Sequence, residues 1–458
     1  MNELEIKNLV SRQRRYFHGH PFPSVQERRN NLKKLYRMVK VHEDEINLAL
    51  RQDLGKSPAE SYMCETGMVL SETRWMIEHL DGLVREKRVP TPLAQYVSRS
   101  FKSSTPCGTV LIMSPWNYPI QLTLEPLADA LAAGNTVILK PSAYSPAVSA
   151  VLDRLLSRTF PKELVALVTG GREENQSLLD QKFDLIFFTG SQQVGKYVLT
   201  KAAPHLTPVV LELGGKSPCI VDSSAKIRLA ARRIVFGKFL NCGQTCVAPD
   251  YLLVQQSILP DLLDAVKKEI VRQFGKNPLE NPDYGKIINR KHFDRISGLI
   301  DQNVAFGGRT DPERLKIEPT LLCPASFDSP AMGEEILGPV LPVLTFKSLG
   351  EVPLLLQDRQ KPLALYMFSE NKKNIRYILD RCQFGGGCIN DCIIHLATSA
   401  MPFGGFGESG MGCYHGREGF ETFSHSRSIV DKKTWLDLPM RYQPYTKIHD
   451  QLVRLFMH

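Results

Sequence analysis

A cysteine in a polar, glycine-containing loop is the first group in this sequence that could carry out covalent chemistry. Cys246 follows a helical pattern and closes the run Asn-Cys-Gly-Gln-Thr-Cys that begins at Asn241. A nucleophilic thiol needs the exposure and backbone freedom of such a loop, whereas an inert cysteine more often lies in an apolar run, as Cys219 does. On these residues alone, a catalytic and an unreactive Cys246 remain open alternatives.

A single carboxylate stands between two leucines at the end of a predicted strand, in the run Leu211-Glu212-Leu213. A buried acid is costly unless it meets a cation or stays protonated with a raised pKa. A carboxyl group of the second kind suits a general base that works near neutral pH. Glu212 is therefore either a structural ion-pair partner or a general base.

An asparagine lies between two prolines where the first predicted strand of the sheet ends. The prolines of the run from Pro115 to Pro119 interrupt the strand, so the side chains should project at its carboxyl end. Asn117 could there offer an amide donor to a developing oxyanion, an interaction that contributes about 3 to 4 kcal/mol. The alternative is an asparagine that serves only the turn.

A glycine-containing segment, from Gly190 through Ser191 and Gly195, follows a strand and opens a predicted helix. Backbone amides and the helix dipole favour a phosphate at such a position. The segment resembles a P-loop, but that motif ends in a Ser or Thr that holds magnesium, and Tyr197 stands here instead. A nucleoside triphosphatase is thus a poor interpretation, and a glycine turn needed only for strand-to-helix packing remains the structural alternative.

Two further groups of reactive side chains give weaker indications of a functional site. Cys388, Cys392 and His395 lack a fourth ligand, and zinc sites usually open with a shorter cysteine spacing, so we predict no metal site. Cys242 stands four residues before Cys246 and could form a protective disulfide, although a plain neighbour is the simpler interpretation.

The elements that must position these groups follow from the hydrophobic pattern. Short uninterrupted apolar runs predict strands buried on both faces, as in a parallel sheet, at 109–113, 136–139, 165–168, 185–188 and 209–213. Helical stretches such as 122–133 can cross between them, which is typical of a doubly wound nucleotide-binding architecture. A second α/β region should follow, with a helix that opens at Ser223 or Ser224 and strands at 251–254 and 340–346.

The residues before this sheet predict helices and one irregular stretch. Ser24 and Glu27 form a capping box, after which apolar residues recur at helical spacing toward Gly55. A second helical pattern runs from about 60 to 83, and the polar, proline-containing stretch 85–104 breaks the periodicity.

The composition indicates a globular protein of two or three domains, because 458 residues exceed one compact core. Basic residues give a net charge of +9 but are spread along the chain, which argues against a nucleic-acid partner. The ten cysteines fall at irregular spacings, as expected in a reducing compartment. We see neither a signal peptide nor a run long enough to span a membrane, and we expect a cytoplasmic protein without an integral membrane anchor.

Taken together, the motifs resemble those of the aldehyde dehydrogenase superfamily, in the same order and over nearly the whole chain. The strings that carry the resemblance are 115–119, 139–142, 188–191, 211–216, 241–246, 334–339 and 402–405. The continuations at 246–251, 362–368 and 419–425 resemble the class-three branch, whose members act on medium or long aliphatic and aromatic aldehydes.

The resemblance implies a role for each reactive residue. Cys246 is the nucleophile, Asn117 and the Cys246 backbone amide form the oxyanion hole, and Glu212 activates the water that releases the acid. The cofactor, NAD or NADP, is expected to contact Trp116, Lys140, Ser142, Gly190, Ser191, Gly195, Leu213, Glu335 and Leu337. The implied reaction is oxidation of an aldehyde to a carboxylic acid through a thiohemiacetal and a thioester on Cys246.

Two residues depart from the family pattern. Ala143 stands just after Lys140-Pro-Ser, where many members carry a glutamate that repels a 2′-phosphate, so we expect NADP to be accepted. Leu337 replaces an aromatic residue, which could loosen the hold on the nicotinamide ring without abolishing activity.

The resemblance further implies a Rossmann-type cofactor domain, an α/β catalytic domain and a small β oligomerisation arm. We expect the cofactor domain at 1–84 and 105–210, the catalytic domain at 211–396, and the arm and tail at 85–104 and 397–458. The class-three likeness implies a homodimer.

Two rival functions remain at this stage. A CoA-acylating aldehyde dehydrogenase would pass the acyl group to a thiol, but such enzymes typically lack the deacylating glutamate that Glu212 supplies. A non-catalytic binding protein on the same scaffold would not need Cys246, Glu212 and Asn117 together.

Overall fold

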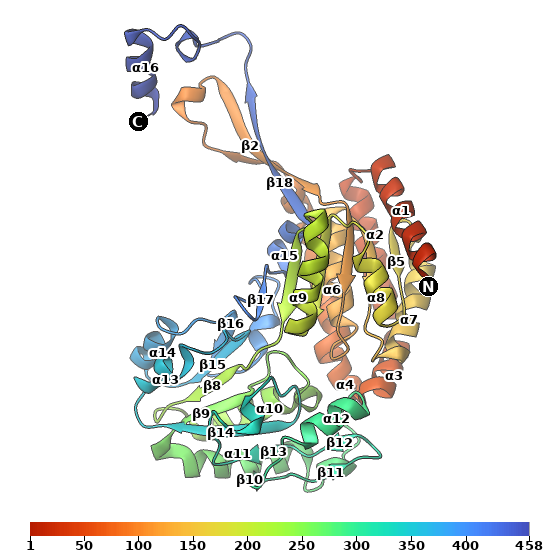
Figure 1. Cartoon of the computed structure of the whole chain (residues 1–458), viewed down its shortest axis with the longest axis vertical. Helices are drawn as coiled ribbons and strands as arrows, with labels where there is room; N and C mark the ends of the chain where they lie inside the picture. Colours follow the sequence, from red (N-terminus) through yellow and green to blue (C-terminus); the bar gives the residue numbers. More distant parts are fainter. Residues whose placement is uncertain (458) are drawn as a thin grey trace.

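The computed structural model describes residues 1–457, which form an α/β body and a protruding arm (Figure 1). The body contains two sheets. The first has six strands in the order β17-β7-β6-β3-β4-β5. Its strands are β3 (Thr109–Met113), β4 (Thr136–Lys140), β5 (Val165–Leu167), β6 (Leu185–Gly190), β7 (Val209–Leu213) and β17 (Gly410–Met411). All neighbours pair in parallel except β17, which is antiparallel to β7, so the predicted parallel sheet is confirmed.

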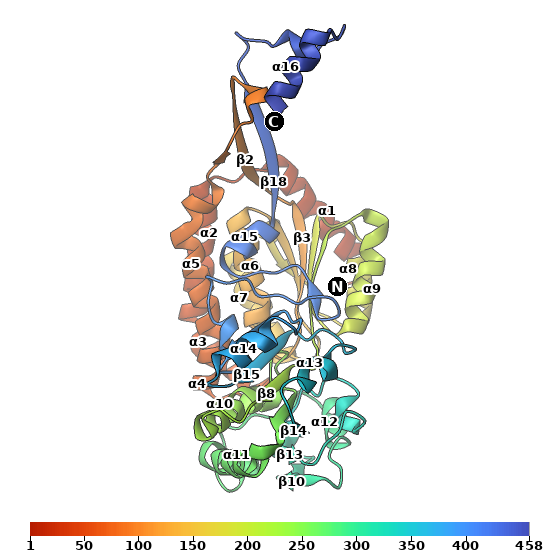
Figure 2. The same cartoon turned by 90° about the vertical axis from the view of Figure 1, so that its left-hand side faces the viewer.

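Helices cover both faces of this first sheet (Figure 2). One face carries α1 (Glu3–Gly19), α8 (Arg172–Leu179) and α9 (Gln192–Ala202), and the core beneath them includes Ile6, Leu111 and Val198. The opposite face carries the remaining helices, α2 (Val25–Val41), α3 (Glu43–Leu54), α5 (Gly67–Val84), α6 (Gln121–Ala133), α7 (Pro146–Thr159) and α15 (Gly416–Thr422). Because successive strand residues point to opposite faces, the apolar runs are buried on both sides.

The second sheet has seven strands in the order β10-β13-β14-β9-β8-β15-β16. They are β8 (Pro218–Val221), β9 (Tyr251–Gln255), β10 (Val304–Phe306), β13 (Thr320–Leu322), β14 (Val340–Phe346), β15 (Ala364–Phe368) and β16 (Gly386–Ile389). Its helices are α10 (Ile227–Phe239), α11 (Leu259–Phe274), α12 (Arg290–Ser297), α13 (Glu351–Leu356) and α14 (Lys372–Leu379), and a small pair, β11 (Thr310–Asp311) and β12 (Lys316–Ile317), lies apart.

The arm is a three-stranded antiparallel sheet that extends away from the body (Figure 1). It comprises β1 (Lys87–Val89), β2 (Ser98–Pro106) and β18 (Ser424–Lys432), followed by α16 (Lys447–Met457) at the tip. The β2–β18 ladder runs from Pro106 opposite Ser424 to Ser98 opposite Lys432. Half of the irregular stretch predicted at 85–104 thus belongs to the arm strands β1 and β2. No helix in residues 1–457 is long and apolar enough to cross a membrane.

The structure differs from the sequence prediction at two places. The helical pattern predicted from about 60 to 83 is divided into α4 (Pro58–Ser61), a π-helical turn η1 (Tyr62–Thr66) and α5. The helix expected from Ser223 or Ser224 begins at Ile227, because both serines belong to a turn in which Asp222 accepts bonds from Ser224.

The predicted division of the chain into domains stays a prediction. Strand β7 spans the boundary expected at residue 210, and β17 and α15 pack in the first sheet's layer although 397–458 was assigned to arm and tail. A segment that leaves the second sheet therefore returns to the first before it enters the arm.

Candidate active site

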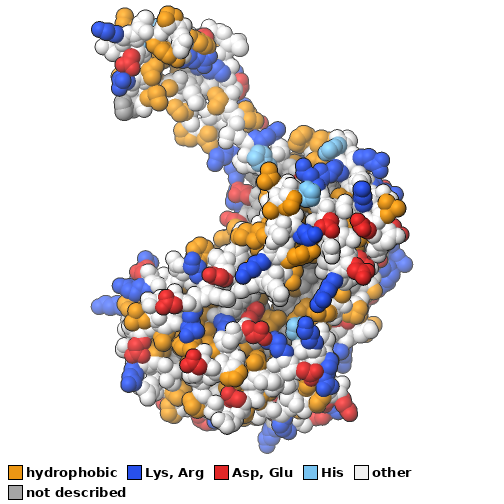
Figure 3. All heavy atoms as spheres, viewed as in Figure 1, with side chains coloured by type: hydrophobic (Ala, Val, Ile, Leu, Met, Phe, Trp, Pro, Cys, Tyr) orange, Lys and Arg blue, Asp and Glu red, His pale blue; other side chains and the backbone are white. Residues whose placement is uncertain are grey.

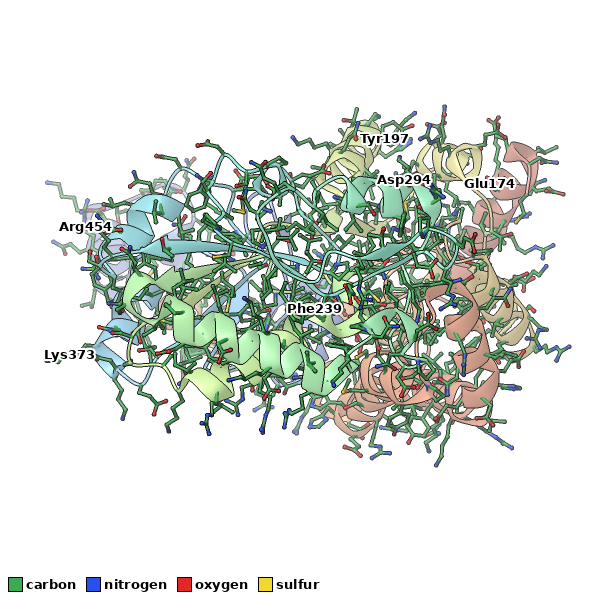
Figure 4. The ribbon with its side chains drawn as sticks, turned by 90° about the horizontal axis from the view of Figure 1, so that it is seen from below. Glu174, Tyr197, Phe239, Asp294, Lys373 and Arg454 are labelled. Carbon is green, nitrogen blue, oxygen red and sulfur yellow. The ribbon has the colours of Figure 1, made fainter. Side chains whose placement is uncertain are left out.

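A sharp turn between α10 and β9 positions Cys246. The helix ends at Phe239, which is buried in the interior, whereas Tyr197 of α9 and Lys373 of α14 lie at the periphery (Figure 4). Asn241, Cys242 and Gly243 then take left-handed backbone angles in succession, with φ of 51°, 54° and 73°. A Cβ at residue 243 would lie 2.3 Å from the Gly338 carbonyl oxygen, so this position requires glycine.

The candidate oxyanion donor lies against this turn. The Asn117 side-chain nitrogen donates to the Gln244 carbonyl oxygen at 3.1 Å, two residues before Cys246. In return, the Asn241 side chain donates to the Asn117 carbonyl oxygen at 2.9 Å. The end of β3 and the cysteine loop are thereby locked together, which supports the interpretation of Asn117 as more than a turn residue. Cys242 is buried beside this turn and, like Cys246, is a free thiol.

The Cys246 thiol is held neutral in the protein without substrate. Burial raises its pKa to about 12, and the nearby carboxyl groups of Glu335 and Glu212 add to the shift. Ionisation of this thiol would need a positive charge or a proton acceptor, which bound ligands would bring. The side chain is only partly exposed, at the inner end of a cavity.

Glu212 ends strand β7 and is 3% exposed. Neither of its carboxyl oxygens has a hydrogen-bond partner within residues 1–457, and no Lys or Arg lies within ion-pair distance there. Burial alone raises its pKa well above the usual value. Of the two interpretations left open by the sequence, this arrangement favours a proton acceptor over a structural ion pair.

An apolar cavity of about 140 Å³ leads to Cys246. Its polar side chains are few, and at its inner end the Tyr118 hydroxyl bonds the Thr245 hydroxyl at 2.5 Å. The cavity is lined by residues that include Met63, Met68, Leu122, Phe236, Leu240, Val247, Ile394 and Phe403. Such a lining favours an apolar substrate that presents one reactive group to the thiol.

A larger cavity of about 1000 Å³ is lined by three of the predicted cofactor residues, Ser191, Glu335 and Leu337. Ser191 caps α9 at its edge, accepting a bond from the Val194 amide at 3.4 Å. Gly195 packs so closely on Leu213 that a Cβ there would lie 2.8 Å from the leucine side chain. Gly190 ends β6 just before this cap. The glycines therefore allow close packing, and the N-terminus of α9 offers the backbone amides that favour an anion.

Lys140, Ser142 and Trp116 do not line this cavity, although Trp116 contacts His292, which does. Lys140 ends β4 and donates to the Pro141 and Gly170 carbonyl oxygens, each at 2.8 Å, while burial lowers its pKa to about 8. Trp116 packs at 5.0 Å, centroid to centroid, on His292 of α12. Ser142 forms the turn after β4, where its hydroxyl accepts from the Tyr144 amide at 3.2 Å, and Leu337 lines the cavity.

The residues fit a dinucleotide, as judged from the polar groups that the protein leaves unsatisfied. One carboxyl oxygen of Glu335 is buried without a hydrogen-bond partner among the described residues, and burial raises its pKa to about 8. A Cβ on Gly214 would lie 1.9 Å from the other oxygen, so only glycine leaves room for this side chain. Glu335 is thereby presented to the cavity with an unused acceptor, as a ribose hydroxyl requires.

Lys216 is a functional residue that the sequence did not single out. Its ammonium group pairs with Asp250 and donates to the Ala331 and Glu334 carbonyl oxygens at 2.8 and 2.9 Å, which fixes the loop that carries Glu335. The run Leu-Gly-Gly-Lys216 is visible in the sequence, but the two carbonyl oxygens that bind the lysine lie more than 100 residues away.

The metal-like group on β16 shows a different arrangement. The Cys388 sulfur lies 3.6 Å from His395 Nδ1, whereas Cys392 is buried with its Cβ against Gly237. Within residues 1–457, no three His, Cys, Asp or Glu side chains are arranged to hold a metal.

Comparison with known proteins agrees with this geometry. The sequence profile described as "Aldehyde dehydrogenase family" matches residues 1–429. The chain belongs to the aldehyde dehydrogenase family. It is similar to 4,4′-diaponeurosporen-aldehyde dehydrogenase of Staphylococcus aureus, with 45% identity over 97% of each chain. It is also 44% identical to the rat "Aldehyde dehydrogenase, dimeric NADP-preferring", over 93% of this chain and 94% of that one.

Solved structures of aldehyde dehydrogenases share the fold. The structure described as a substrate-bound state of Staphylococcus aureus AldH superposes with a TM-score of 0.97 at 43% identity and covers 99% of both chains. An NAD-dependent aldehyde dehydrogenase from Sinorhizobium meliloti gives 0.87 at 26% identity, covering 96% of this chain and 89% of that one. This dehydrogenase therefore oxidises aldehydes with NAD or NADP, and the predicted fold class and enzyme class are confirmed.

Proposed function

We propose that this enzyme oxidises lipophilic aldehydes to carboxylic acids through a thioester on Cys246, with Asn117 as oxyanion donor and Glu212 as general base. The observation that carries the proposal is the convergence of three groups: a thiol at the inner end of an apolar cavity, an amide donor bonded two residues before it, and a buried carboxyl group without a partner.

In the first half of the reaction, the Cys246 sulfur adds to the aldehyde carbon, the π bond of the carbonyl group opens, and the thiol proton passes to water. The carbonyl oxygen then carries negative charge, and the Asn117 side-chain amide and the Cys246 backbone amide stabilise it. Asn117 must exchange the Gln244 carbonyl for this oxygen. When bound, the nicotinamide cofactor accepts the hydride that the aldehyde carbon gives up.

In the second half, an acyl group is attached to Cys246 as a thioester. Glu212 in its ionised form takes a proton from water, the oxygen of that water adds to the acyl carbon, and the Cys246 sulfur leaves. A carboxyl group with a raised pKa holds this proton until it can pass to solvent. Glu212 also disfavours the CoA-acylating alternative, which needs no such base.

The substrate class is inferred from the cavity and from the relatives. The lining beside Cys246 is apolar over most of its surface, and burial of a hydrocarbon chain contributes about 0.8 kcal/mol per CH₂ group. One similar protein is named for an isoprenoid aldehyde, 4,4′-diaponeurosporen-aldehyde. We infer that medium or long aliphatic and aromatic aldehydes are oxidised more efficiently than short ones. We further propose a cytoplasmic homodimer, which ten free cysteines and the arm support.

Intact-mass analysis of a rapidly quenched reaction tests this function. With an aldehyde series of increasing chain length, kcat/KM should rise with length, and a substrate-derived mass should appear on wild-type enzyme but not on Cys246→Ala. CoA should leave the product as the free acid. If Cys246→Ala forms reduced cofactor at the wild-type rate, or if acyl-CoA replaces the acid, the proposed mechanism is wrong.

A further inference from the structure

A fully buried ion pair lies behind the Asn117 loop. Lys56 follows the end of α3, and Glu65 belongs to the π-helical turn η1; both side chains are completely inaccessible to solvent. The Lys56 ammonium nitrogen lies 2.5 Å from a Glu65 carboxyl oxygen. Neither residue lines the cavity that leads to Cys246.

The pair bonds both ends of the loop that carries the oxyanion donor. Lys56 donates to the Asn117 carbonyl oxygen at 2.9 Å, and its nitrogen lies 4.0 Å from the centre of the Tyr118 ring. The other oxygen of Glu65 accepts the backbone amides of Ile120 and Gln121, at 2.9 and 3.0 Å. The loop from Asn117 to the start of α6 is therefore held at its carbonyl side by the cation and at its amide side by the anion.

The same segment also reaches the cysteine loop. Glu60, which lies between the two charged residues in sequence, accepts the backbone amide of Asn241 at 2.8 Å. Asn241 is the first of the left-handed residues that turn the chain toward Cys246, and its side chain bonds the same Asn117 carbonyl as Lys56 does. Residues 56–65 thus hold the donor loop and the nucleophile loop relative to each other.

Stability alone does not account for this pair. Removing two charges from water costs several kcal/mol per ion, and well-packed apolar replacements of a buried ion pair are often as stable or more stable. A π-helical turn is also less favourable than a continuous α-helix and is frequently found at functional sites. What the charges provide is directional hydrogen bonding to the backbone on both sides of Asn117.

We propose that Lys56 and Glu65 are positioning residues that aim the Asn117 amide at the substrate oxyanion. The inference rests on the role proposed above for Asn117. Loss of the Lys56 bond would leave the Asn241 side chain as the one remaining donor to the Asn117 carbonyl, so the peptide plane would be held less firmly and the side-chain amide would move with it. A misplacement of about 1 Å in a catalytic group can lower a rate by roughly 100-fold.

A double-mutant cycle between Lys56→Met and Asn117→Ala tests the proposal. Lys56→Met should lower kcat by about 10- to 100-fold, with the Kd of NAD changed less than about twofold. Asn117→Ala should lower wild-type kcat by about 100- to 1000-fold but have a much smaller effect in the Lys56→Met background. With a deuterated aldehyde, the isotope effect on kcat should increase in Lys56→Met, because hydride transfer becomes slower than the later steps.

Two further variants separate positioning from stability. Lys56→Met/Glu65→Gln removes both charges but keeps an acceptor for Ile120 and Gln121, so its unfolding midpoint should return toward wild type while kcat stays low. Lys56→Arg, which keeps a charged donor, should recover part of kcat. Arg309→Met, which breaks a pair with Glu318 on the far strands, is the control and should keep wild-type kcat. If Lys56→Met does not fold, the charge-free double variant replaces it in the cycle.

The outcomes distinguish this inference from the function on which it rests. If Asn117→Ala is slow but its effect simply multiplies with that of Lys56→Met, or if kcat returns together with stability, the pair is structural and the inference is wrong. If Asn117→Ala itself keeps wild-type kcat, the proposed oxyanion role fails first, and the inference falls with it.

Discussion

Burial holds the two central reactive groups of the site in their neutral forms. Burial raises the pKa values of both Cys246 and Glu212, and the Glu212 carboxyl group adds to the shift of the thiol. Because like charges so close together are costly in an apolar pocket, only one of the two can readily be ionised at a time. Glu212 must therefore lose its own proton before it can accept one from water, which suits a reaction in which the thiol is consumed first and the carboxyl group acts later.

Glu212→Gln should separate the two halves of the reaction. The variant keeps the shape of the side chain but cannot accept a proton, so hydride transfer should proceed once and deacylation should become at least about 100-fold slower, within the usual contribution of a general base. Stopped-flow absorbance should show one equivalent of reduced cofactor per Cys246 followed by a very slow phase. Sustained turnover at the wild-type rate would exclude Glu212 as the base.

The same substitution should change how stability depends on pH. Above pH 4.5, an unfolded Glu212 ionises while the folded one stays protonated, so the folded state binds more protons and wild-type stability falls as pH rises. In this window, each pH unit costs the wild type up to about 1.4 kcal/mol relative to Glu212→Gln. Urea unfolding between pH 5 and 8 should show the difference growing in favour of the variant. Glu313→Gln, at an exposed position, should show no such trend.

At the residue scale, a candidate reactive group could be predicted where it stands in one short motif. A group whose role depends on contacts with distant parts of the chain could not. Cys246, Glu212 and Asn117 stand in runs whose local pattern signals exposure, burial or a strand end. Lys56 stands in a short link between two helical patterns and Glu65 in an ordinary helical pattern, and their proposed role depends on Asn117, more than 50 residues away. No local periodicity reports such a contact.

At the scale of elements, strands were predicted more accurately than helix boundaries. The runs at 109–113 and 209–213 match β3 and β7 in full, because a strand buried on both faces leaves an uninterrupted apolar signal. The start of α10 was placed too early, because the serines that seemed to cap it hydrogen-bond within a preceding turn. The division of the 60–83 pattern at η1 was missed, because a π-helical turn alters the period by a single residue.

The turn between β4 and α7 should determine the choice between NAD and NADP. Ala143 is exposed there, next to Lys140 and Ser142, where a family glutamate would repel a 2′-phosphate. Ala143→Glu should lower kcat/KM for NADP by about tenfold or more, equivalent to about 1.4 kcal/mol, and change that for NAD by less than about threefold. Steady-state kinetics with both cofactors measures this directly.

Ala143→Gln is the matched control for that experiment. It has nearly the size of glutamate without its charge, so repulsion predicts that NADP use survives in this variant. Equal losses in the glutamate and glutamine variants would mean that space, not charge, governs the site. A wild-type enzyme that strongly prefers NAD would contradict the role of Ala143.

The arrangement of the whole molecule could be predicted only in part, because its connections depend on short segments. Strand β17 has two residues, too few for any sequence pattern, yet it returns the chain to the first sheet and pairs Gly410 with Glu212. The resemblance to the family did imply an arm, and the structure has one. Its position far from the body leaves a hollow on one side of the molecule (Figure 3).

The arm should hold a second copy of the chain. Trp435 and Leu455 near its tip are 72% and 69% exposed, and β18 leaves one backbone edge unpaired in the sheet order β1-β2-β18. Exposed large apolar side chains beside an open strand edge are typical of a surface covered by a partner. Light scattering should give twice the chain mass of 51.6 kDa for the wild type, and Trp435→Ser/Leu455→Ser should shift the protein toward the monomer. Leu48→Ser, equally exposed at 69% but on helix α3 of the body, should remain dimeric. A wild-type protein that is monomeric at micromolar concentration would show that these side chains have another role.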